Sequence, residues 1–274
     1  FEKTALEYAK LNGILYQQGE WADFVDRAFG KTYYVQCTSG NDSTGDGSVT
    51  YPFKTIKKAC DSIENGGYGT IRLDEAGDYE ITADIDLIAK NIHIQTILNT
   101  TQANIKFVAY DDGGENNVYR FNLYKGSNLY ATVYDIEMDA PEDIANDWND
   151  NCAGFAIYDG LSSVGLYARN DILFSATATT PDNDYPSLIM PFLTTYDVRL
   201  GTPIINIGAN GNITTNNQGY LLDANEMVCI FNVTTGTIDN SNYWVKGGVD
   251  MVKPTLISGA ILDGSASGTT LSIR

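Results

Sequence analysis

Five short segments between residues 71 and 107 alternate apolar and polar side chains: Ile71-Arg72-Leu73, Tyr79-Glu80-Ile81, Ile85-Asp86-Leu87, Ile92-His93-Ile94 and Ile105-Lys106-Phe107. Alternation with a period of two is the pattern of a β-strand that buries one of its faces. The segments follow one another at intervals of roughly 7 to 13 residues, and no helix-length pattern comes between them. Three architectures fit this pattern: a sandwich, a barrel and a solenoid.

The turns between these segments favour the solenoid. A sandwich usually alternates recognisable hairpin signals, whereas these turns vary in length and often hold a single Asn, Gly or Asp. Such turns suit strands that bend around a coil and stack on the next coil. We therefore predict an all-β chain folded as a parallel β-helix.

The β pattern continues towards the C-terminus. It recurs at residues 118–121, 131–138, 155–158, 164–167 and 172–174, and later at 204–207, 220–222, 228–233 and 256–257. Three prolines and two aspartates cluster between residues 177 and 191, which marks a change in composition. We predict coils over residues 67–185 and a C-terminal β region over 186–274, which is either a continued solenoid or a separate β unit.

Residues 1–30 carry a different pattern. Trp21, Phe24, Val25 and Ala28 stand at the spacing of one helix face. The segment is predicted to be an N-terminal helical neck, which either packs on its own domain or bundles with copies of itself.

Residues 31–66 are predicted to form an opening loop and a capping helix. Tyr33-Tyr34-Val35 reads as a short strand, and residues 40–47 consist almost entirely of turn formers. A helix is expected from residue 53 to about residue 63, where Asn65-Gly66-Gly67 ends it. Asp42 and Asp46 could bind a cation, but hydrogen bonding within the loop is the stronger interpretation.

This opening stretch resembles a known family. Residues 33–47 (YYVQCTSGNDSTGDG) and 51–63 (YPFKTIKKACDSI) are similar to the first segment of bacteriophage tailspike and tail fibre proteins of the pectate-lyase-like right-handed β-helix superfamily. The likeness extends over residues 31 to about 95 and beyond them concerns architecture alone. It implies a right-handed β-helix, usually a homotrimer displayed on the virion and directed at the host surface. It implies no activity, because the same scaffold serves lyases, hydrolases and inert binding proteins.

Charge and composition exclude several classes of partner. The chain has 17 Lys and Arg against 35 Asp and Glu, a net charge of -18 that repels nucleic acid and anionic membranes. No stretch is apolar enough to span a bilayer, so we expect a protein without membrane insertion. An acidic surface is compatible with neutral sugars and unfavourable for polyanionic substrates. We expect no cofactor, since no nucleotide-binding loop follows a strand.

The four cysteines, Cys37, Cys60, Cys152 and Cys229, lack metal-site spacing and are expected to be free thiols. Cys60 lies in an apolar helical stripe and is expected in the core.

The main catalytic candidates are Asp135, Glu137 and Asp139. If Ile136 and Met138 point inward, these three carboxylates point outward, and neighbours two apart on a strand lie roughly 6.5 to 7 Å apart. That separation suits an inverting glycosidase pair or a shared calcium ion, although any solvent-facing strand of an acidic protein shows the same alternation.

Other polar and aromatic residues admit two interpretations. Asp143, Asp147 and Asp150 lie in an acidic loop that could bind calcium or be merely solvated. His93, the only histidine, is expected to face outward and could be a general base, but without a nucleophile motif such as G-x-S-x-G a structural role is favoured. The 18 tyrosines could grip sugars or stack in the core, and for Tyr130, Tyr134, Tyr158 and Tyr167 the sequence does not decide.

These observations predict a structural virion protein, a phage tail fibre or tailspike subunit that forms a homotrimer and recognises a host surface glycan or receptor. Its N-terminal segment would join other tail proteins, and assembly would take place in the host cytoplasm. A tailspike depolymerase with Asp135, Glu137 and Asp139 as acid and base, and a bacterial surface adhesin, are the alternatives.

Overall fold

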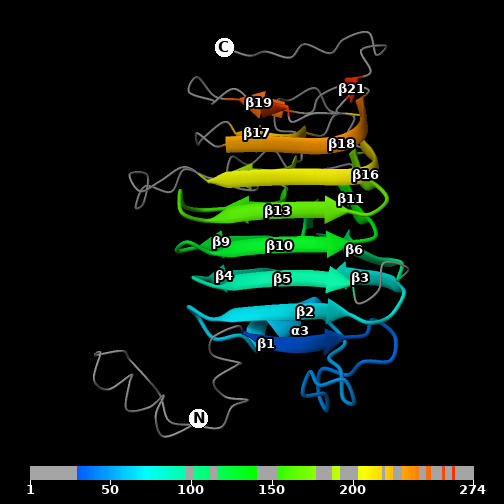
Figure 1. Ribbon diagram of the computed structural model, residues 1–274, viewed down its shortest axis with the longest axis vertical. Helices are drawn as coiled ribbons and strands as arrows, with labels where there is room; N and C mark the ends of the chain where they lie inside the picture. The colour runs from blue at the N-terminus through cyan, green and yellow to red at the C-terminus, as the bar shows by residue number, and fades with distance from the viewer. Residues whose placement is uncertain are drawn as a thin grey trace, which may run out of the picture.

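Short parallel strands stack coil upon coil from one end of the molecule to the other (Figure 1). A computed structural model describes residues 30–96, 101–111, 116–140, 153–176, 187–191, 203–217, 220–224, 230–240, 245–247, 255–256 and 261–262. The six coils between residues 68 and 247 each contribute a strand, or half of a long strand, to each of three sheet faces, which are called here the first, second and third face.

The first face begins at the N-terminal end of the molecule. Its strands are β1 (Lys31–Val35), β2 (Tyr68–Leu73), β5 (Asn91–Thr96), β10 (Asn128–Val133), β13 (Ser163–Ala168), the first halves of β16 (Ile204–Asn217) and β18 (Ile230–Asn240), and β20 (Thr255–Leu256). Neighbours pair in parallel without any slip, so that Asn91 stands beside Tyr68, and Asn128 beside Asn91.

The other two faces complete the coil. The second face holds β3 (Gly77–Ile81), β6 (Ala103–Phe107), β11 (Ile136–Ala140), β14 (Ile172–Ala176), the second halves of β16 and β18, and β21 (Ile261–Leu262). The third face holds β4 (Ile85–Ile88), β9 (Phe121–Tyr124), β12 (Ala153–Ile157), β15 (Ser187–Pro191), β17 (Tyr220–Ala224) and β19 (Val245–Gly247). The long strands β16 and β18 run through the corner between the first two faces and join them into one sheet.

The coil is right-handed. In Figure 1 the first-face strands point to the right while the chain climbs from β1 at the bottom to β18 near the top, as expected for crossovers between parallel strands. The predicted parallel β-helix is confirmed. The predicted N-terminal helix lies outside the described residues.

The core is a stack of inward-pointing side chains. Ile71, Ile94, Ala131 and Leu166 lie in register on successive coils, and all four are buried. Each buried Ile or Leu stabilises the fold by about 1.5 to 3 kcal/mol. Because the strands pair in register, the inward residues predicted from the alternation stack on one another and form continuous columns of apolar side chains.

Two segments differ from the sequence-based prediction. Residues 118–121 are not one strand, because β8 (Asn116–Val118) pairs antiparallel with β7 (Ala109–Asp111) in a hairpin, and β9 begins at Phe121. Residues 131–138 are divided at Tyr134 and Asp135, where the chain turns from the first face to the second. The end of a hairpin in the first case, and a corner of the coil in the second, interrupts a pattern that looked continuous in the sequence.

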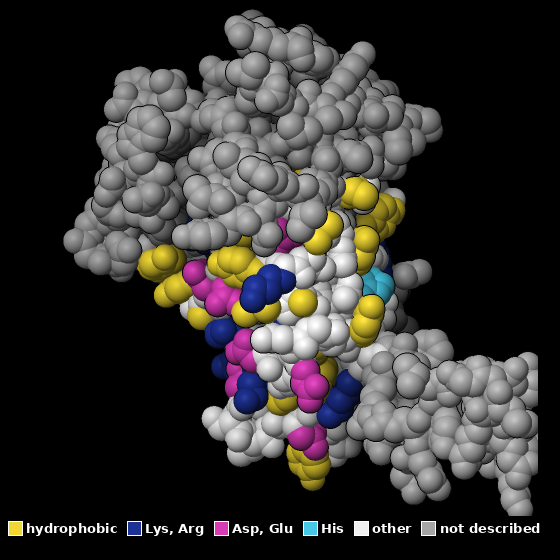
Figure 2. Space-filling view, turned by 90° about the vertical axis from the view of Figure 1, so that its left-hand side faces the viewer, with side chains coloured by type: hydrophobic (Ala, Val, Ile, Leu, Met, Phe, Trp, Pro, Cys, Tyr) yellow, Lys and Arg dark blue, Asp and Glu magenta, His cyan; other side chains and the backbone are white. Residues whose placement is uncertain are grey.

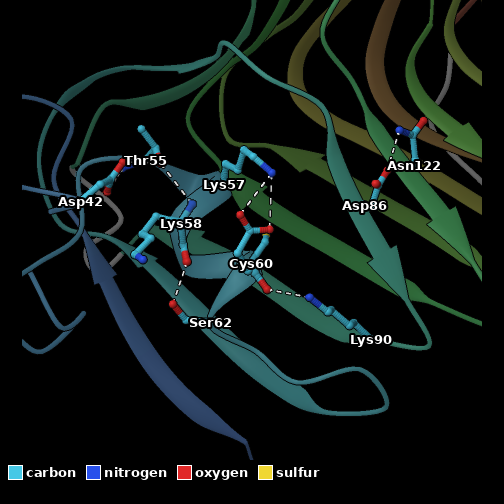
Figure 3. Close-up of polar contacts among 10 residues, drawn as sticks. Asp42, Thr55, Lys57, Lys58, Cys60, Ser62, Asp86, Lys90 and Asn122 are labelled. Atoms are coloured by element: carbon cyan, nitrogen blue, oxygen red, sulfur yellow. Dashed lines mark hydrogen bonds and ion pairs between the residues drawn. The ribbon is translucent and has the colours of Figure 1, made fainter.

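The capping helix α3 (Ile56–Asp61) is shorter than predicted. Phe53 lies outside it and forms a parallel bridge with Val35, because its amide donates to the Tyr34 carbonyl. The helix begins only after Thr55, whose hydroxyl accepts the Lys58 amide (Figure 3). Its apolar face, Ile56, Ala59 and Cys60, closes the end of the core.

Replacing Thr55 by alanine is expected to lower the free energy of unfolding by about 1 kcal/mol, since one helix N–H loses its acceptor. Thr55 also donates to Asp42, whose carboxylate accepts the amides of Lys54 and Thr55. Urea denaturation would measure the effect, and Thr55→Ser should restore most of it. No change in Thr55→Ala would contradict the capping role.

The hydrogen-bonding role of the loop aspartates is confirmed. Asp42 binds the start of the helix, and Asp46 accepts the Ser48 amide. Cys60 and Cys37 are free thiols, and Cys60 is buried in the core, as predicted. Cys152 and Cys229 lie outside the described residues.

Strands beyond the proline-rich stretch join the same sheets as those before it. Strand β16 pairs with both β13 and β14, and β17 pairs with β15. The described strands after Pro191 thus extend the solenoid, while the limits assigned to the four segments of the chain stay predictions. Within the described residues, no helix has the length and apolar character needed to cross a bilayer.

Candidate functional site

Asp135 lies at a corner, and its carboxylate is mostly buried, with 9% of the residue exposed. It accepts the Asp171 amide at 2.7 Å and the Asn170 side-chain amide at 3.0 Å, both from the next coil. Asp171 repeats the pattern, since it accepts the Asn212 amide at 2.7 Å. Asp135 was expected to point outward, but it is one step of a ladder that ties successive corners together.

Glu137 points outward from β11, between the buried Ile136 and Met138, as expected. It aligns with Lys106 on β6. Partial burial raises the pKa of the Glu137 carboxyl, and the charge of Asp78 adds to the rise while Lys106 opposes it. Asp78 is itself bound by Lys106 at 3.6 Å and by Asn104 at 2.9 Å. The side chain of Asp139 lies outside the described residues, so Glu137 is the one catalytic candidate described as facing solvent.

The proposed calcium ligands Asp143, Asp147 and Asp150 lie outside the described residues. In the part of the chain that the structure does describe, no group of three His, Cys, Asp or Glu could hold a metal ion.

His93 faces outward from β5 on the first face, as predicted, between Thr70 on β2 and Tyr130 on β10. Partial burial lowers the pKa of its imidazole, which disfavours the charged form. In Figure 2 the histidine lies at the right-hand edge among hydrophobic side chains, away from most of the charged ones.

Three tyrosines are exposed on this same first face. Tyr68 on β2, Tyr130 on β10 and Tyr167 on β13 have 59%, 48% and 38% of their surface accessible. Tyr130 leans over Gly165 on the next strand, where a Cβ would lie 2.5 Å from its ring. The absence of a side chain at Gly165 lets the ring lie against the sheet. We call the outward side of β2, β5, β10 and β13 the tyrosine face.

A row of hydrogen-bonded polar side chains borders the tyrosine face. The Asn128 side chain donates to that of Asn91 at 2.7 Å, and the Ser163 hydroxyl donates to the Asn128 oxygen at 2.5 Å. The Tyr167 hydroxyl donates to Asn210. These bonds hold the side chains in fixed orientations, so the face presents hydroxyl and amide groups without prior rearrangement.

The third face carries a second aromatic pair, which the sequence did not predict. Tyr124 and Tyr158 stack with ring centroids 4.6 Å apart, and the Tyr158 hydroxyl donates to the Asn122 oxygen at 3.4 Å. The Asn122 side-chain amide donates in turn to Asp86 at 2.9 Å (Figure 3). Burial raises the pKa of both tyrosine hydroxyls. Asn122 is only 5% exposed, so this cluster is packed rather than open. The two tyrosines are neighbours because they are separated by one full coil, and the length of a coil cannot be read from the sequence.

The structure thus separates the four tyrosines whose roles were open. Tyr130 and Tyr167 are surface residues, Tyr158 is stacked, and Tyr134 is half-buried at a corner. Aromatic and hydrogen-bonding side chains come together on the tyrosine face, which makes it the candidate binding site.

Comparison with known proteins adds little to this description. No family model and no curated protein sequence matches the chain. Among solved structures, a chain named "Rhamnogalacturonan lyase" aligns with a TM-score of 0.45 and 14% identity, covering 84% of this chain and 65% of that chain. This chain therefore spans less than two thirds of the length of that protein. A likeness of this size says nothing about activity or substrate, and the parallel β fold is established by the strand pairing itself.

Proposed function

We propose that this protein is a bacteriophage tail fibre or tailspike subunit that binds a glycan of the host surface on the tyrosine face. The observation that carries the glycan part is the presence of Tyr68, Tyr130 and Tyr167 on one outward sheet face. The phage part is supported by the resemblance of residues 33–63 to tailspike proteins.

The geometry of the tyrosine face suits an extended saccharide. Neighbouring strands lie about 4.8 Å apart and residues two apart on a strand about 6.7 Å, which puts the Cα atoms of Tyr130 and Tyr167 about 8 Å apart. Aromatic rings offer flat apolar surfaces with a polar end, and the neighbouring amides and hydroxyls can hydrogen-bond to sugar hydroxyls. Several consecutive sugar units can therefore lie along the coils.

The hydrogen bonds and ion pairs of the carboxylates near Glu137 favour binding without cleavage. Asp135 accepts the Asp171 amide of the next coil. Asp78 forms an ion pair with Lys106 and accepts the Asn104 side-chain amide. Neither stands free to pair with Glu137 as an acid and base. A depolymerase and a bacterial adhesin are the alternatives that the experiments below distinguish.

The double variant Tyr130→Ala/Tyr167→Ala is expected to weaken glycan binding by about tenfold or more, since each aromatic contact contributes about 0.5 to 1.5 kcal/mol beyond its buried area. Binding to purified surface polysaccharide of susceptible bacteria would be measured by biolayer interferometry. Tyr51→Ala is the matched control, because Tyr51 is 61% exposed and lies in the opening loop. Equal affinity of the double variant and the control would overturn the proposed site.

The same preparation separates binding from cleavage. Polysaccharide of unchanged length after incubation supports a binding protein. Shortened chains, with cleavage lost in Glu137→Gln, would replace the proposal by the depolymerase. We further propose a homotrimer whose N-terminal segment joins other tail proteins, and a monomer in multi-angle light scattering would overturn the trimer.

A further inference from the structure

The described outward positions of the first face hold no acidic side chain, although the chain as a whole is strongly acidic. The chain holds 35 Asp and Glu against 17 Lys and Arg. On β1, β2, β5, β10, β13 and the first half of β16, the outward positions include no Asp or Glu. Arg72 and His93 are the cationic groups among these outward positions, and the exposed Lys31 stands at the first residue of β1 with its ammonium over the Tyr33 ring.

The adjoining second face shows the opposite composition. The described outward positions of β3, β6 and β11 are Asp78, Glu80, Asn104, Lys106 and Glu137, three of which are acidic. Both faces belong to the same coils and have the same strand geometry. The difference between them therefore lies in the side chains alone.

The cationic groups of the first face are poorly suited to capture an anion. The Arg72 guanidinium lies over the Tyr34 ring, 6.0 Å from its centroid, and its Nε is buried without a hydrogen-bond partner among the described residues. Partial burial lowers the pKa of the His93 imidazole, which disfavours its charged form. The Arg72 guanidinium, which lies over an aromatic ring, does not offset the repulsion that a net charge of -18 exerts on an anionic polymer.

An uncharged face suits an uncharged ligand for a physical reason. A ligand that covers a charged side chain without neutralising it must strip that charge of water, which is strongly unfavourable. A neutral saccharide offers no counter-charge, so it binds best where the protein presents aromatic rings, amides and hydroxyls. The tyrosine face presents these groups, with Asn91, Asn128 and Ser163 already held in place.

We propose that the tyrosine face selects uncharged polysaccharide and excludes polymers that carry carboxylate or phosphate groups. This inference rests on the proposed glycan-binding function and adds the chemical class of the ligand. The acidic second face contributes to the exclusion, since it flanks the site with negative charge.

The test is an array of purified bacterial surface polysaccharides, sorted into uncharged and anionic members and probed with the full chain. The proposal expects uncharged members to bind. Their affinity should change by less than about twofold from about 0.01 M to about 1 M sodium chloride, over which the Debye length falls from roughly 30 Å to roughly 3 Å. Binding confined to anionic members, with affinity falling about tenfold or more over that range, would overturn the inference and leave the proposed function standing.

A pair of charge variants gives an independent readout. Arg72→Gln removes a cation from the first face, and Lys106→Gln removes one from the second face, so both change the net charge equally. For an uncharged ligand no charge pair is lost, so any effect of Arg72→Gln, like that of Lys106→Gln, should be the same within about twofold at about 0.01 M and about 1 M sodium chloride. A loss of about tenfold at low salt that disappears at high salt, confined to Arg72→Gln, would indicate an anionic ligand and overturn the inference. Failure of every polysaccharide to bind would instead overturn the proposed function itself.

Discussion

Replacing Phe155 by alanine is expected to lower the free energy of unfolding by about 3 to 5 kcal/mol, because the ring is fully buried and its loss leaves a cavity. Phe155 stacks on Phe121 at 5.3 Å and meets the edge of Phe107 at 5.1 Å. These rings come from β12, β9 and β6 of two adjacent coils. Removing one ring therefore weakens the contact between coils as well as the contact between faces.

Urea denaturation followed by far-ultraviolet circular dichroism would measure the Phe155→Ala effect as a lowered midpoint at an unchanged slope. Leu161→Ala is the control, since Leu161 is 59% exposed and its truncation should change stability by no more than about 0.5 kcal/mol. Similar losses in the two variants would contradict the assignment of Phe155 to the core.

Asp159→Ala is expected to lower the free energy of unfolding by about 2 to 4 kcal/mol, the second large effect. The carboxylate is 5% exposed and accepts the amides of Leu161 and Ser162, each at 2.8 Å, together with the Ser162 hydroxyl at 2.9 Å. It also reaches the amide of Gly126 in the preceding coil at 3.3 Å. Alanine would leave these buried donors without an acceptor.

Chemical denaturation of Asp159→Ala beside Asp61→Ala would test this role. Asp61 is exposed and forms an ion pair with Lys57 at 3.2 Å, a surface pair expected to contribute no more than about 1 kcal/mol. Asp159→Asn keeps one acceptor oxygen and should lose less than Asp159→Ala. Equal stability of Asp159→Ala and Asp159→Asn would show that the hydrogen bonds of this corner do not stabilise the fold.

The Asp159 corner also connects stability with the proposed site. It holds the chain immediately before Ser163, where β13 begins and where Gly165 and Tyr167 follow. Gly126, at a φ of 75°, turns the preceding coil in a backbone conformation that favours glycine. The binding face is therefore built on corners whose polar groups are satisfied, and loosening one of them is expected to weaken glycan binding as well.

Local chemistry allowed several features to be predicted from the sequence. The inward positions follow from the alternation, as at Ile71 and Leu73, because the side-chain period of a strand does not depend on its neighbours. The roles of Asp42 and Asp46 also follow from the sequence, since turn aspartates bond to amides close by in the chain or just across the loop.

Corners were harder to predict than strands. The pattern through Asp135 looked like one strand with three outward carboxylates, yet the chain turns there and Asp135 bonds to the next coil. A bend of two residues preserves the alternation on both sides of it, so periodicity cannot reveal it. The hairpin of β7 and β8 was missed for a similar reason, because Val118 is apolar and buried in either arrangement.

The sequence by itself determined that this is a β-solenoid of stacked alternating strands, opened by a capped loop and carrying a strong negative charge. Only the tertiary structure decided which outward residues share a face. Tyr68, Tyr130 and Tyr167 lie far apart in the chain and meet on one face because Asn91, Asn128 and Ser163 start their strands in register. Coils differ in length through their corners and insertions, so lateral neighbours depend on strand pairing, which no local pattern encodes.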